Sequence, residues 1–85
     1  DAGSVEVFPN PVMGDGMSIR FGGAAASNGR WMLHNALGTL VREGTLRATQ
    51  GDVFVSTAGL GGGLYFASLY SNGRVVATKR VVIAR

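Results

Sequence analysis

The sequence predicts a small antiparallel β-sandwich, and three observations lead to this fold class. Short runs rich in β-branched and aromatic residues recur along the 85-residue chain at a spacing of roughly 8–12 residues. Turns that contain glycine separate these runs, and glycine accounts for 14 of the residues. No segment has the 3.6-residue apolar period of an amphipathic helix. About seven short strands in two packed sheets therefore account best for the pattern.

The first two strands are expected on either side of a proline-rich turn. Val5–Phe8 must end at Pro9-Asn10-Pro11, because two prolines remove N–H donors that a strand ladder needs. This first strand is therefore predicted at the edge of a sheet or at the point where the chain enters one. Gly14-Asp15-Gly16 forms a second turn, and Met17–Phe21 follows as a half-buried strand with its apolar side chains on one face.

The middle of the chain contains two further strands after a segment of small residues. Gly22–Gly29 has no periodicity and is predicted to be a loop, although its three alanines could form a single helical turn. Trp31–Ala36 alternates in side-chain character and leads into a turn that ends at Gly38. Thr39–Arg47 is predicted to be the next strand, with a bulge or bend at Gly44, because a residue without Cβ weakens a regular ladder.

A long hairpin closes the chain and is predicted to organise the fold. Val53–Val55 is a short strand, and the loop Ser56–Gly63 leads from it to the hairpin. The two arms are Leu64–Tyr70 and Arg74–Arg85, joined at Asn72-Gly73, a residue pair that primed hairpin turns favour. Both arms have apolar residues on both faces, which predicts central strands or strands that are covered on both sides.

Composition limits the chain to one domain and excludes several classes of function. The single domain comprises residues 1–85, and a chain of this size buries only about 60–65% of its unfolded surface. It has no cysteine, so disulfides and thiolate metal sites are excluded. Eight basic and five acidic residues give a net charge of +3, but the basic residues are dispersed and form no nucleic-acid-binding stripe. We expect the isolated domain to be a monomer.

No targeting or membrane segment is expected within the chain. It opens at Asp1 without the basic and apolar regions of a signal peptide, so we expect it to be a piece of a longer precursor. The stretch from Val53 to Gly73 has no charge, but polar residues and glycines interrupt it. It is therefore predicted to form strands and turns rather than a membrane-spanning helix.

Few residues have the pattern of a catalytic or metal site. His34 is the only histidine, and the acidic residues are too scattered to orient it as a general base, so we expect no enzyme activity. Asp15 and Asp52 lack the spacing of a calcium loop and are predicted in turns. Gly59–Gly63 fits neither phosphate-binding glycine motif and is predicted to be a turn before a strand. No cofactor is expected.

Three aromatic residues offer an alternative function. Trp31, Tyr65 and Tyr70 could form a platform for a sugar or a base if at least two of them were exposed on one face. The chain would then be an Ig-like or carbohydrate-binding sandwich attached to a secreted enzyme. Burial of these side chains in the core is the competing interpretation.

Four short motifs occur in an informative order along the chain. A hydrophobic residue precedes Pro9-Asn10-Pro11, and an alternating apolar segment with an asparagine later ends at Gly38. Gly63-Leu64-Tyr65 comes next, followed by the turn at Asn72-Gly73. The last motif contains Lys79, Arg80, Val81, Val82, Ile83 and Arg85. In this order, and over essentially the whole chain, the motifs resemble the C-terminal sorting domain of proteins that Bacteroidetes-type bacteria export through the type IX secretion system.

The resemblance implies an Ig-like β-sandwich of about seven strands that acts as a folded export signal. Such a domain is carried at the end of a cargo protein through the periplasm. There the outer-membrane translocon or its shuttle protein recognises it, and the cargo moves to the cell surface or the medium. A sortase-like peptidase at the cell surface would then remove the domain, with a cut around Asp1 to Ser4 or just upstream, and could attach the cargo to lipopolysaccharide.

The resemblance also implies which residues are recognised. They are Pro9, Asn10, Pro11, Gly38, Gly63, Tyr65, Gly73, Lys79, Arg80, Val81, Val82, Ile83 and Arg85. The terminal strand among them could dock by strand addition or through its basic groups. Alternatively, this strand belongs to the core and its charges are solvated.

Overall fold

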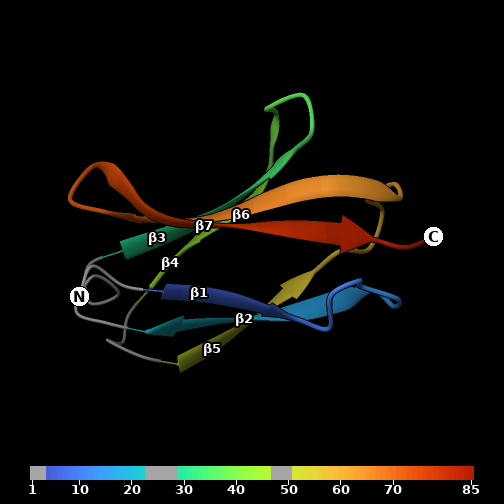
Figure 1. Ribbon diagram of the computed structural model, residues 1–85, viewed down its shortest axis with the longest axis horizontal. Coiled ribbons are helices and arrows are strands. Elements are labelled where there is room, and N and C mark those ends of the chain that lie inside the picture. The colour runs from blue at the N-terminus through green and yellow to red at the C-terminus, as the bar shows by residue number, and fades with distance from the viewer. Residues whose placement is uncertain (1–3, 23–28, 47–50) are drawn as a thin grey trace.

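The chain folds into two antiparallel sheets that pack face to face (Figure 1). A computed structural model describes residues 4–22, 29–46 and 51–85. None of these residues lies in a helix of the length and apolarity that a membrane span requires. The described residues form seven strands, which confirms the predicted fold class: β1 (Ser4–Phe8), β2 (Gly16–Gly22), β3 (Gly29–Asn35), β4 (Leu40–Thr45), β5 (Gly51–Ser56), β6 (Gly63–Ser71) and β7 (Arg74–Ile83).

The strand order is that of an Ig-like sandwich. One sheet has the order β1-β2-β5 and the other the order β4-β3-β6-β7. In Ig constant-type terms these are strands A, B and E facing strands C, F and G, with the fourth strand paired to the third instead of the fifth. Val12 pairs in parallel with Ile83, so after β1 the chain passes from the edge of one sheet to the edge of the other. The prediction that the first strand is an edge strand is confirmed.

The core lies between the sheets and is built largely from alternate residues of β1, β2, β3, β6 and β7. Along β1 the side chains alternate strictly between buried and exposed, as a strand with one face on a core requires. The three-stranded sheet contributes Met17 and Ile19, and the four-stranded sheet contributes Leu33, Leu69 and Ile83, all of them almost completely buried. The inward-facing apolar residues of the two sheets therefore meet in one core.

The ladder is regular at Gly44, so the bulge predicted there is wrong. Trp31 pairs with Gly44 in an unbroken register, and the irregularity in this pair of strands lies between Leu33 and His34. A Cβ atom on Gly44 would lie 2.5 Å from the indole Nε1 of Trp31. Gly44 therefore provides space for the Trp31 ring, which is buried against its backbone.

The closing hairpin has the predicted turn, but one of its arms lies at the edge of its sheet and packs on the core with only one face. Asn72 and Gly73 have φ angles of 54° and 80°, as a primed turn requires. β6 is a central strand, whereas β7 is the last strand of its sheet. Leu64 and Val82 pair with each other on the outer face and are 37% and 39% exposed. The prediction of two central or fully covered arms is therefore wrong for β7, since only one of its faces packs on the core.

Asp52 lies within β5 and not in the turn that the sequence predicts. It faces Arg20 of β2, and the Arg20 Nε lies 3.0 Å from the Asp52 Oδ1. This hydrogen bond raises the pKa of Arg20 above its ordinary value. The same guanidinium lies 5.0 Å from the centre of the Phe8 ring. An aspartate that resembled a turn residue is thus part of a cross-strand contact on the outer face of the three-stranded sheet.

Replacing Gly44 by alanine is expected to lower the free energy of unfolding by about 1–3 kcal/mol, because the added methyl group must displace the Trp31 ring. Urea unfolding followed by tryptophan fluorescence measures this change. Gly61→Ala is the matched control, since a Cβ atom there has no neighbour within 4 Å. It should change the free energy of unfolding by less than about 1 kcal/mol. Equal destabilisation by both substitutions would contradict the role assigned to Gly44.

Candidate functional site

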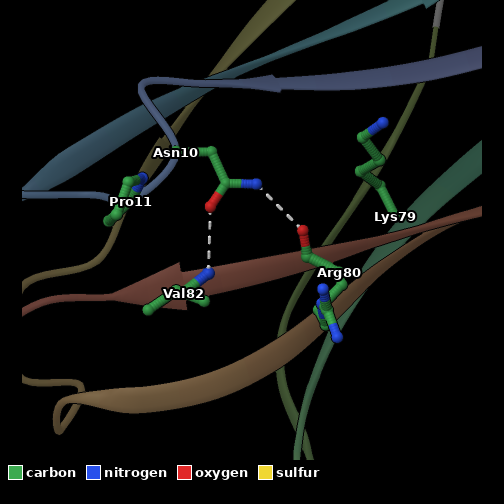
Figure 2. A pocket seen from close by; sticks show the side chains of 5 residues that line it. All are labelled: Asn10, Pro11, Lys79, Arg80 and Val82. Carbon is green, nitrogen blue, oxygen red and sulfur yellow. Dashed lines mark hydrogen bonds between the residues drawn. The ribbon is translucent and has the colours of Figure 1, made fainter.

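The Pro-Asn-Pro turn lies against β7 and is held there by the side chain of Asn10 (Figure 2). The Asn10 Nδ2 donates to the carbonyl oxygen of Arg80 at 2.9 Å, and the Asn10 Oδ1 accepts from the N–H of Val82 at 3.1 Å. The side-chain amide thus bonds to the edge of β7 as a peptide group of a neighbouring strand would. This contact joins the first and the last of the four sequence motifs.

Val12 continues this pairing toward the end of the chain. Its N–H donates to the carbonyl oxygen of Val82 at 2.8 Å, and its carbonyl oxygen accepts from the N–H of Ala84 at 2.9 Å. The Val12 side chain is completely buried. Pro9 and Pro11 have no N–H to donate, so at this point an asparagine side chain makes the contacts that a backbone would otherwise make. Sequence reasoning missed Val12, for which the only signal was an apolar residue after the prolines.

A shallow groove lies beside this contact. Its lining consists of Asn10, Pro11, Lys79, Arg80 and Val82. Lys79 and Arg80 are exposed and point to opposite faces of β7, because consecutive side chains of a strand alternate (Figure 2). The structure therefore brings the proline turn and the basic pair together but places the two charges on different faces.

Arg85 is engaged in the fold, unlike the other basic residues of its motif. Its Nη2 donates to the carbonyl oxygen of Thr57 at 2.7 Å, and its Nη1 lies 3.0 Å from the Asp15 Oδ1. Thr57 is completely buried, and its hydroxyl donates to the Gly14 carbonyl oxygen at 3.3 Å. A Cβ atom on Gly62 would lie only 2.8 Å from the Arg85 carbonyl oxygen, so the end of the chain lies directly on the Gly62 backbone. Sequence reasoning missed Thr57, because nothing local marks a buried threonine.

The described basic residues fall into two groups. Ion pairs join Arg20 to Asp52, Arg30 to Glu43 and Arg85 to Asp15, and Arg42 donates to the carbonyl oxygens of Ser56 and Ala58. The remaining three are all on β7 and have no acidic partner among the described residues: Arg74, Lys79 and Arg80. The described basic side chains that have neither an acidic nor a carbonyl partner thus all lie on the closing strand. Within residues 4–22, 29–46 and 51–85, no group of three His, Cys, Asp or Glu side chains could hold a metal ion.

Comparison with known families shows what this arrangement belongs to. Residues 6–84 match the secretion system C-terminal sorting domain. The chain belongs to this family. No curated protein and no solved structure matches it. The resemblance seen in the four motifs is therefore confirmed, and the chain is a type IX sorting signal, which implies export across the outer membrane.

The Gly-Leu-Tyr motif of the sorting domain forms a tyrosine corner. The Tyr65 hydroxyl donates to the carbonyl oxygen of Gly61 at 2.7 Å, near the start of β6. This is the bond that Ig-like domains use at the start of the corresponding strand. Tyr65 is only 7% exposed and Trp31 only 8%, so the alternative of a platform formed by Trp31, Tyr65 and Tyr70 is wrong. Burial in the core is the correct interpretation for Trp31 and Tyr65.

The motif that ends in Gly38 forms the turn between β3 and β4. The Asn35 Oδ1 accepts hydrogen bonds from the N–H groups of Leu37 and Thr39, at 3.0 and 2.9 Å. Gly38 has a φ of 87°, a conformation that side chains disfavour. Gly38 and Gly73 thus lie in turns at opposite ends of the four-stranded sheet and far from the groove at Asn10. The structure does not bring all the predicted recognition residues together.

Replacing Asn10 by alanine should destabilise the sorting domain by about 1–3 kcal/mol, because two hydrogen bonds worth about 0.5–1.5 kcal/mol each are lost. This corresponds to a melting temperature at least about 4 °C lower, measured by circular dichroism. Lys79→Ala is the control, since Lys79 lines the same groove with an exposed side chain, and it should cost no more than about 0.5 kcal/mol. An unchanged melting temperature for Asn10→Ala would mean that its side chain does not hold β7.

Replacing Arg85 by glutamine is expected to cost about 1.5–3 kcal/mol, the range for a hydrogen bond from a charged group, because the bond to the Thr57 carbonyl is lost. Asp15→Asn should cost less than about 1 kcal/mol, because Asp15 is 77% exposed and surface ion pairs contribute little. Urea unfolding distinguishes the two variants. If Asp15→Asn were as destabilising as Arg85→Gln, the ion pair and not the carbonyl contact would hold the end of the chain.

Proposed function

We propose that this sorting domain is recognised as a folded unit, in the periplasm, by the outer-membrane translocon or its shuttle protein. The observation that carries this proposal is the pairing of Asn10 with Arg80 and Val82. Residues that are 70 positions apart in the sequence lie within hydrogen-bond distance only when the domain is folded. A receptor that contacts both the proline turn and the closing strand therefore distinguishes folded cargo ends from unfolded ones.

The exposed cations beside the turn supply chemistry that a receptor can recognise. Lys79 and Arg80 line the groove, and neither has an acidic partner among the described residues. Val81 and Ile83, which follow the two cations on β7, are buried and act through the fold. Recognition by the machinery thus depends on the groove residues, while the apolar run keeps β7 in its sheet.

The proposed route ends with removal of the domain at the cell surface. A sortase-like peptidase would cut around Asp1 to Ser4 or just upstream, and the cargo would be released or attached to lipopolysaccharide. Residues 1–3 lie outside the described residues, whereas Ser4 begins β1 and pairs with Gly22. A peptidase needs an extended, unpaired segment, so the cut is proposed before Ser4.

The carbohydrate-binding alternative has no comparable support. It required two exposed aromatic side chains on one face from Trp31, Tyr65 and Tyr70, and the first two are buried. The sorting-domain family is also not a family of enzymes. Export is the function that the fold and the family favour together.

Fused to the C-terminus of a periplasmically targeted reporter, the domain should move the reporter to the surface or the medium of a bacterium with a working type IX system. The double variant Lys79→Gln/Arg80→Gln should be exported several-fold less well yet melt within a few degrees of the parent, because exposed substitutions cost about 0.5 kcal/mol each. Arg74→Gln removes a charge from the other end of β7 and is the control. Reporter activity in the periplasmic, surface and medium fractions measures export.

Two outcomes of this assay would contradict the proposal in different ways. Retention of the parent fusion in the periplasm, while the translocon exports its own cargo, would refute the signal function. Unchanged export by a folded Lys79→Gln/Arg80→Gln variant would show that the export machinery does not recognise the basic pair. Recognition would then depend on the backbone, on apolar shape or on another face.

A further inference from the structure

The edge of β7 has free backbone groups next to the Asn10 contact. Both the N–H and the carbonyl of Val82 point away from β6, toward Asn10 and Val12. Because every second residue of an antiparallel strand faces the same side, those of Arg80 and Thr78 point outward as well. The carbonyl oxygen of Arg80 already accepts a hydrogen bond from the Asn10 side chain. The Arg80 N–H and both Thr78 groups have no bond to any of the residues that the structure describes.

This free edge is short and bounded at both ends. The Asn10 contact closes it at Arg80, and an irregularity in the β6–β7 ladder, between Leu69 and Tyr70, interrupts it near Val75. A bulge and an edge lysine are devices by which sheets avoid indiscriminate strand pairing. The edge therefore suits a partner of a few residues with matching chemistry and does not suit an arbitrary strand.

The charges at this edge define that chemistry. Lys79 and Arg80 are exposed, lie on opposite faces of β7 and lack acidic partners among the described residues. A second copy of the same edge would bring like charges together, which disfavours self-pairing. An extended partner alternates its side chains in the same way, so two adjacent carboxylates would lie opposite Lys79 and Arg80.

We propose that the β7 edge at Thr78 and Arg80 binds an extended acidic segment of the export machinery by strand addition. Backbone hydrogen bonds to Thr78 and Arg80 provide the affinity, and the two cations select a segment with adjacent acidic residues. This inference rests on the proposed export function, because that function requires a receptor for the folded domain. The groove beside Asn10 and Pro11 receives the end of the added segment.

Synthetic peptides test the chemistry of the partner. Capped peptides of valine and threonine carry two adjacent glutamates, two glutamines or two lysines at the centre. The acidic peptide should bind and shift the amide NMR signals of Thr78 and Arg80. The glutamine peptide should bind about 2- to 30-fold more weakly, as expected for the loss of two exposed ion pairs. The lysine peptide should not bind. Added salt should lower the affinity for the acidic peptide more than that for the glutamine peptide.

Variants of the domain test the mode of binding. Thr78→Pro removes an outward N–H but no backbone bond to β6, which an edge strand tolerates. It also removes the 3.3 Å contact between the Thr78 and Ser68 hydroxyls, and Thr78→Val removes that contact as well. Thr78→Pro should lower the affinity for the acidic peptide at least about fivefold. Thr78→Val keeps the N–H and should bind this peptide as tightly as the parent does. Circular dichroism checks folding. If Thr78→Pro is unfolded, the Lys79→Gln/Arg80→Gln variant provides the test instead. Its affinity for the acidic peptide alone should fall about 2- to 30-fold.

Three results would overturn the proposal. They are equal binding of the three peptides, amide shifts confined to another surface, and formation of a dimer through β7 that excludes the peptide. The reporter assay separates this inference from the export function. Normal export of a folded Thr78→Pro variant that no longer binds the peptide would refute strand addition and leave the export role in place, whereas failure of the parent to export would refute the role itself.

Discussion

The contact between Asn10 and the edge of β7 is the interaction on which the arrangement of the domain depends. It lies where the chain leaves the three-stranded sheet and joins the edge of the four-stranded one. With prolines on both sides, the Asn10 amide is the group that can bond to Arg80 and Val82, and Val12 then continues the pairing with its backbone. The Asn10 side chain and the Val12 backbone thus join the segment after the first strand to the last strand, and Asn10 lines the groove beside this contact.

The residues that follow β7 are held by contacts of a different kind. Arg85 reaches the buried Thr57 and the exposed Asp15, and its backbone lies on Gly62. A domain of this size is stable by only about 4–13 kcal/mol, so contacts worth one or two kcal/mol each are a large share of the total. The surface formed by the turn and β7 therefore exists only while the whole sandwich is folded, which suits a signal that reports on folding.

Most motif residues of the sorting domain have partners inside the fold. Asn10 bonds to a strand edge, Gly38 forms a turn with Asn35, and Tyr65 closes a corner through Gly61. These residues determine the shape that is presented. The basic pair Lys79 and Arg80 has no such role among the described contacts, and for that reason the two are the motif residues best suited to contact another molecule.

The sequence by itself determined the all-β class, the approximate strands and their turns, and the family, because alternation, prolines and Asn-Gly pairs act through local backbone geometry. Only the tertiary structure decided that β7 is an edge strand, that Gly44 accommodates the Trp31 ring, and that Asp52 pairs with Arg20. It also decided that Arg85 is bound within the fold, while Lys79 and Arg80 have no acidic partner in the part of the chain that the structure describes. Each of these features depends on which segments become neighbours. The packing of residues far apart in the chain sets this, and local propensity does not predict it.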